Sequence, residues 1–221
     1  SKLTDEKRLG EILDETMSRA RMRLENSSHS SAAMRAASYY SPLSSFYDRT
    51  GGIGFYQFWR KFTERCSKEE GYRLKLGKKL MEVAKTLFTA SNMTVSYTAD
   101  EEGYGRLPAA LAAFKAVLPE GNGIRYPYEF KPELKNEGFR TASQVNYVAC
   151  CGTFGESAYT GALKVLKVIL NYEYLWVNLR VKGGAYGCMS SFGRNGETML
   201  VSYRDPSWAR QTGFMRESRS I

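Results

Sequence analysis

The sequence contains a single histidine, His29, among 221 residues. A zinc site with two histidine ligands is therefore impossible within this chain, and any histidine-based catalytic pair would need His29. Its four cysteines include no Cys-x-x-Cys pair, and the adjacent Cys150 and Cys151 suit neither zinc chelation nor a simple disulfide. We expect four reduced thiols and no metal bound by this chain.

Long apolar runs are missing as well. No run of about 18 apolar residues occurs, which argues against a transmembrane helix. The N-terminus, SKLTDEKRLGEILDE, is charged from the start and lacks the apolar core of a signal peptide. We therefore expect no membrane partner and a cytoplasmic protein, or an organelle matrix protein if the source is eukaryotic.

Acidic residues are outnumbered, 23 against 32 basic ones, so the net charge is +9. Such an excess permits binding to anionic partners. The basic residues are spread along segments such as KLGKKLMEVAK, and they do not form a run with interleaved aromatic residues. This distribution is typical of solvated helix faces and argues against nucleic acid as a partner, which stays the third alternative.

His29 lies in the stretch ENSSHSSAAMRAASYY, which is rich in serine and alanine. Serine and asparagine favour helix starts, so the stretch indicates a break in a helix followed by a new N-terminus. No cysteine, aspartate or glutamate accompanies the histidine in a ligand pattern. We expect a structural or capping role for His29.

The first part of the chain is predicted to be mainly helical, with one strand. Its loop is expected at 48–54, DRTGGIG, and alternation of apolar residues predicts a half-buried strand at 92–100. Apolar residues recur at helical spacing over 5–26, 32–40, 55–66, 73–90 and 107–118.

A long segment without regular periodicity follows. Residues 119–138 contain three prolines and three glycines, and a stretch of this length is more typical of a linker than of a domain interior. We therefore predict one unit over 1–120, a linker over 121–138 and a second unit over 139–221.

The second unit is predicted to combine a small sheet with helices. A strand is expected at 142–149 and a hairpin at 185–204, because Asn195-Gly196 is a strong hairpin signal. Helices are expected at 158–169 and at 174–181, the latter as a separate helix or as a continuation. The predicted fold class is α+β, an antiparallel sheet with helices packed on one face.

The stretch VNLRVKGGAYGCMSSFGRNGETMLVSYRDP, residues 177–206, resembles the C-terminal half of the pitrilysin/insulinase-type zinc metallopeptidases, in particular the presequence-protease branch. The segments NEGFRTASQVNYVA, YTGALKVLKVILNYEYLW, HSSAAMRAASYYSP and GGIGFYQFW resemble this branch too. The element R-x-x-G-G-A-Y-G is the most specific of these matches. The resemblance covers nearly the whole chain, up to about Pro206.

The resemblance implies an enzyme of two halves that close around a peptide chamber, each half with two homologous α/β domains. The N-terminal half binds zinc through H-x-x-E-H, and the C-terminal half supplies an arginine and a tyrosine that reach the substrate. On this match the catalytic candidates are Arg180 and Tyr186. Gly183 and Gly184 would let the strand approach the substrate backbone. The implied partners are a peptide and the N-terminal half of the same enzyme.

Elementary chemistry agrees with these roles. Hydrolysis of a peptide bond builds negative charge on the carbonyl oxygen, and a guanidinium and a phenol are suitable donors to that charge. The alternative from the residues alone is that Arg180 interacts with a helix C-terminus, where a cation is favoured. Tyr186 would then be a residue of a core strand.

The first hypothesis is a piece of a presequence-protease-like, zinc-dependent peptidase that contributes substrate binding and transition-state stabilisation. It would hold parts of two homologous domains and be inactive alone. The runner-up is a non-catalytic structural or peptide-binding subunit of the same fold. Partial sheets would leave open edges, which either join within the chain or pair between two chains; we expect the homodimer.

Overall fold

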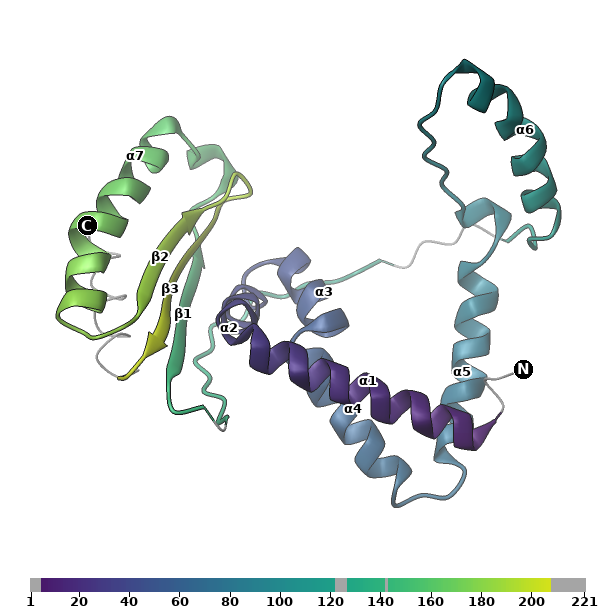
Figure 1. The fold of residues 1–221 in the computed structure, drawn as a ribbon, viewed down its shortest axis with the longest axis horizontal. Helices are drawn as coiled ribbons and strands as arrows, with labels where there is room; N and C mark the ends of the chain where they lie inside the picture. Colours follow the sequence, from purple (N-terminus) through teal and green to yellow (C-terminus); the bar gives the residue numbers. More distant parts are fainter. Residues whose placement is uncertain (1–4, 122–126, 142, 208–221) are drawn as a thin grey trace. The chain divides into compact units, whose positions relative to one another are not determined.

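The computed structural model describes residues 5–121, 127–141 and 143–207 (Figure 1). No described helix combines the length and the apolarity needed to cross a bilayer. The helices and strands are, in chain order, α1 Glu6–Asn26, α2 Ser28–Ala37, α3 Pro42–Gly51, α4 Ile53–Cys66, α5 Tyr72–Leu87, η2 Ala90–Asn92, α6 Glu101–Ala116, β1 Asn146–Thr153, η3 Glu156–Ala158, α7 Gly161–Ile169, η4 Leu170–Val181, β2 Gly187–Phe192 and β3 Glu197–Asp205.

The chain divides into two compact units. Residues 1–15 group with 63–129, and residues 16–62 group with those from 130 onward. This packing differs from the predicted division at 121–138, because helix α2 packs on the sheet, which lies far from it in sequence. As a statement about homologous domains, the predicted division stays a prediction, and residues 122–126 of its linker lie outside the described residues.

The first unit has no strand at 92–100 in the part that the structure describes, so the strand prediction is wrong. The preceding segment makes its backbone hydrogen bonds elsewhere: Ala90 N–H donates to Pro119 O at 2.8 Å and Ser91 N–H to Glu120 O at 2.9 Å. The side chain of Asp100 then accepts from Gly103 N–H at 2.8 Å and caps α6. The helix therefore begins several residues before the predicted range of 107–118.

The loop predicted at 48–54 is also wrong, because α3 and α4 are separated by Gly52 alone. The carboxylate of Asp48 accepts from Gly54 N–H, with both oxygens at 3.2 Å from the nitrogen. That interaction satisfies an N–H group that the first turn of α4 leaves without a helical partner. A single buried carboxylate thus joins two helices where the glycines suggested an open loop.

The second unit contains a three-stranded antiparallel sheet in the order β1-β3-β2. The hairpin of β2 and β3 matches the prediction at 185–204, and the α+β class is confirmed. β1 begins later than the predicted range of 142–149, whose first residue is outside the described part. One face of the sheet packs against α7 and η4, and the buried cluster there comprises Val148, Leu170, Leu175, Leu179, Ala185 and Leu200.

Helix α2 lies against the other face of the same sheet (Figure 1). The thiol of Cys151 donates to Ala33 O at 3.6 Å, whereas its neighbour Cys150 packs against the cluster on the opposite face. This alternation is the one expected for consecutive strand residues. The predicted layer of helices on one face is therefore joined by a second helical layer.

The segment that follows residue 129 is attached to α2 by an ionic cluster. Arg35 contacts Glu137 at 2.8 Å and Asp48 at 2.7 Å, and Lys135 contacts Glu137 at 3.2 Å. Glu133 N–H also donates to Tyr39 O at 2.9 Å. The later half of the predicted linker therefore has no regular secondary structure, but it is held by specific contacts.

Candidate functional site

Arg180 is carried by a wide helical segment. Residues 170–181 continue α7 as a π-helix, so the prediction that 174–181 continues the preceding helix is confirmed. Leu175 and Leu179 are fully buried against the sheet and fix this segment, while Arg180 lies next to the buried face and stays partly exposed. π-Helical segments are rare and are frequently found at functional sites.

Two glycines then reverse the chain. Gly184 has φ +80°, and its N–H donates to Arg180 O at 3.0 Å, while Ala185 N–H donates to Leu179 O at 3.0 Å. A left-handed glycine that satisfies the last helical carbonyls is the common way for a helix to end. Gly183 and Gly184 therefore shape the turn from η4 into β2, and their predicted approach to a substrate backbone stays a prediction.

The turn brings Arg180 and Tyr186 together. A guanidinium N–H of Arg180 donates to the carbonyl oxygen of Tyr186, and the guanidinium carbon lies 5.4 Å from the Tyr186 ring centre. The same carbon lies 4.4 Å from the ring centre of Trp176, one helical turn earlier. Sequence reasoning missed Trp176, although an aromatic residue four positions before an arginine on a helix is a visible signal.

Tyr186 is presented to solvent. Its side chain is 62% exposed, and its N–H donates to Tyr203 O at 3.0 Å, so the backbone is fixed to the end of β3. The alternative of a core strand residue does not fit this exposure. Because Arg180 has five N–H donors and uses one on Tyr186 O, further donors remain for a ligand.

His29 does not belong to this site as a base. It lies on α2 and packs edge-to-face on Tyr203 at 5.1 Å, with Tyr147 at 6.4 Å. Tyr203 in turn lies 6.0 Å from Tyr186, ring centre to ring centre. The structure thus gives His29 a packing role between α2 and the sheet.

The nearest thiol is not an activated nucleophile. Burial raises the pKa of Cys188 to about 11, and the positive charge of Arg180 offsets this only in part. The thiol is therefore protonated near neutral pH, and thiolate chemistry is disfavoured. Cys188 instead packs against the buried cluster beneath η4.

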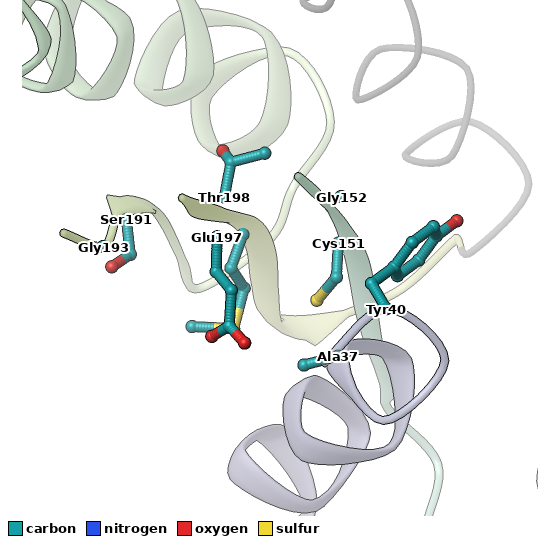
Figure 2. Close-up of a pocket in the computed structure, with 9 residues that line it drawn as sticks. Ala37, Tyr40, Cys151, Gly152, Ser191, Gly193, Glu197 and Thr198 are labelled. Carbon is teal, nitrogen blue, oxygen red and sulfur yellow. The ribbon is translucent and has the colours of Figure 1, made fainter. Parts of the chain in front are cut away.

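A small pocket lies between α2 and the sheet, at the far end of the hairpin from Tyr186 (Figure 2). Its volume is about 90 Å³, well below the range of several hundred Å³ that is usual for ligand pockets. Figure 2 shows the sulfur of Cys151 near Ala37, with the carboxylate of Glu197 at the other side. The pocket therefore does not compete with the exposed arginine–tyrosine pair as a peptide site.

The chemistry of the described residues does not fit a zinc ion. Within residues 5–121, 127–141 and 143–207, no group of three or more histidine, cysteine, aspartate or glutamate side chains could hold a metal. The arrangement at Arg180 and Tyr186 offers donors to negative charge, which is the property of a substrate contact.

Two family descriptions match the chain. "PreP C-terminal domain" matches residues 136–220, which include the arginine–tyrosine pair, and the description of a peptidase-associated region of the same family matches residues 1–62. The chain belongs to the presequence-protease family. Among curated relatives, Protein HypA of Clostridium perfringens is 31% identical over 207 residues, which is 93% of this chain and 21% of that protein.

Further curated relatives carry the family's name. Presequence protease 1, chloroplastic/mitochondrial, of Arabidopsis thaliana is 27% identical over 209 residues, covering 92% of this chain and 19% of that protein. The mitochondrial presequence protease of Saccharomyces cerevisiae is 27% identical over 189 residues, covering 80% of this chain and 19% of that protein. The chain thus spans about a fifth of the length of the curated relatives it matches.

Proposed function

We propose that this chain is the part of a presequence-protease-type peptidase that binds the peptide and stabilises the transition state of its hydrolysis. The observation that carries the proposal is the pairing of Arg180 with the exposed Tyr186 at the turn from η4 to β2. The family matches support it, because they cover the segment that holds this pair.

Both side chains suit the developing charge. As the scissile carbonyl becomes tetrahedral, its oxygen gains negative charge, and the Tyr186 phenol and the free N–H groups of Arg180 would donate to it. Trp176 fixes the guanidinium by a cation–π contact of 4.4 Å, which limits the conformational entropy lost when substrate binds. The two donors would be aligned before the reaction begins, so no reorganisation is needed during it.

The metal is proposed to come from elsewhere in the longer protein. Zinc would be bound by the N-terminal half, which would close on this part to form a peptide chamber, and the 221-residue chain alone would not hydrolyse peptides. The peptide and that N-terminal half are the proposed partners. The proposed compartment is the cytoplasm, or an organelle matrix if the source is eukaryotic; two of the curated relatives are named as mitochondrial or chloroplastic.

A homodimer of the chain remains part of the proposal, and the described contacts favour one edge of the sheet for it. β1 and β2 are the edge strands. The N–H and hydroxyl of Ser190 in β2 both donate to Asn171 Oδ1 of η4 at 2.8 Å, so part of that edge is occupied. Pairing between two chains would therefore use β1.

The experiment is peptide cleavage by the longer protein with Arg180→Ala and, separately, Tyr186→Phe. Each change should lower kcat/KM by roughly 10²- to 10³-fold, with zinc content unchanged. Tyr172→Phe is the matched control, since Tyr172 is an exposed tyrosine on the same helical segment. Parental cleavage rates in both variants would support the alternative, a non-catalytic structural or peptide-binding subunit.

A further inference from the structure

A second arginine approaches Tyr186 from β3. The guanidinium carbon of Arg204 lies 5.9 Å from the Tyr186 ring centre and 5.6 Å from that of Tyr203. Two guanidinium groups, from Arg180 and Arg204, therefore lie near one exposed phenol ring. Among the described residues, neither arginine forms an ion pair with a carboxylate.

The position of Arg204 is produced by a bulge in the sheet. Asn146 pairs with Asp205 and Val148 with Ser202, so β3 advances by three residues where β1 advances by two. Strict alternation would put Arg204 on the same face as Ser202 and the buried cluster. The extra residue turns its side chain away from that face and leaves it exposed.

The backbone supports the same conclusion. Arg204 has φ +49°, and it is the one non-glycine residue with positive φ in the described ranges. Such a conformation is uncommon for a residue with a long side chain, and strained backbone clusters at functional sites. The carbonyl of Arg204 also accepts from Tyr186 N–H at 3.3 Å, which couples the bulge directly to the tyrosine.

We propose that Arg180 and Arg204 form a carboxylate-binding site beside Tyr186, which takes a carboxylate of the peptide substrate. The proposal rests on the proposed function, because it assigns specificity to the same surface. Guanidinium groups match the geometry of carboxylates, and a pair of them without acidic partners attracts such an anion. The carboxylate is the C-terminus of the peptide or an acidic side chain near the bond that is cleaved.

The test is direct peptide binding to the 221-residue chain, measured by fluorescence anisotropy with a short labelled peptide of alanine and serine. The peptide is used with a free C-terminal acid, with a C-terminal amide, and as an amide that contains one glutamate. The parent chain should bind a carboxylate form about fivefold more tightly than the plain amide, since an exposed ion pair contributes up to ~1 kcal/mol. Preference for the free acid assigns the C-terminus, and preference for the glutamate peptide assigns a side chain.

Arg204→Asn removes the guanidinium while keeping a residue that tolerates positive φ, so the fold is expected to survive. This variant should bind all three peptides equally, and Arg204→Lys should retain part of the preference because it retains the charge. Arg194→Asn, at the hairpin turn, is the control and should behave as the parent.

Equal binding of all three peptides by the parent chain would overturn the proposal, and so would an undiminished preference in Arg204→Asn. Either result leaves the proposed function open to its own test, because cleavage by the longer protein with Arg180→Ala or Tyr186→Phe is measured independently. Parental cleavage in those variants together with a lost preference in Arg204→Asn would contradict the function and retain the binding site.

Discussion

Glu137→Gln should destabilise the second unit, because Glu137 is the centre of the cluster that attaches residues 130–139 to α2. Its carboxylate accepts from Arg35 at 2.8 and 3.1 Å, from Lys135 at 3.2 Å and from the hydroxyl of Tyr39. The side chains of Arg35 and Glu137 are only 17% and 20% exposed, so solvent screens the pair weakly. A glutamine keeps the shape but loses the charge.

The size of the effect follows from the acidity of Glu137. Hydrogen bonds from Arg35, opposed by partial burial, lower the pKa of Glu137 from its usual 4.5 to about 2. A shift of this size corresponds to about 3 kcal/mol in the free energy of unfolding. Because the folded-state pKa is depressed, the stabilisation is complete above the unfolded value of 4.5 and is lost as the pH falls toward 2.

The assay is urea unfolding followed by tryptophan fluorescence, which reports on this unit because Trp59 and Trp176 both belong to it. Near neutral pH, Glu137→Gln should unfold about 3 kcal/mol more easily than the parent, and the difference should shrink below pH 4.5. Glu173→Gln, an exposed glutamate on η4, is the control and should change stability by less than about 0.5 kcal/mol. A difference that is absent near neutral pH, or that grows as the pH falls, would refute the reasoning.

Three further predictions concern packing and assembly. Gly54→Ala should cost about 1–3 kcal/mol in urea unfolding, because its Cβ would lie 2.5 Å from Asp48 Oδ2; a neutral result would show that α4 shifts freely. Leu175→Ala should cost about 2–5 kcal/mol because Leu175 is 0% exposed, whereas the 85% exposed Leu134 should tolerate alanine. Light scattering at micromolar concentration should detect a dimer of the chain, and a clean monomer would contradict pairing through β1.

Much of the helical structure and the hairpin could be predicted from the sequence, since both depend on local patterns. Apolar spacing located α1, α4 and α5 to within a few residues, and Asn195-Gly196 located the turn between β2 and β3. These signals require no knowledge of what the element packs against.

The failures occur where distant contacts overrule local patterns. The alternation at 92–100 is typical of a strand, but a strand also needs a partner, and the backbone of Ala90 and Ser91 bonds to residues 119 and 120 instead. The loop predicted around Gly52 ignored the carboxylate of Asp48, which caps the next helix. Neither contact has a signature within a window of a few residues.

The candidate site was divided in the same way. Arg180 and Tyr186 were found through a resemblance to a family, and the turn between them explains their proximity. Arg204 could not be found, because its role depends on a bulge in the pairing of β1 with β3 and on a positive φ. Sequence alternation alone would assign it to the buried face.

The central claim is that Arg180 and Tyr186 act on the transition state more than on the bound peptide. The most direct measurement compares, in the longer protein, the affinity of a phosphinic peptide that imitates the tetrahedral state with that of a matched, uncleaved peptide. Tyr186→Phe should weaken the phosphinic peptide by roughly 10²-fold while changing the affinity of the matched peptide by less than about threefold. Equal weakening of both ligands, or of neither, would contradict the account.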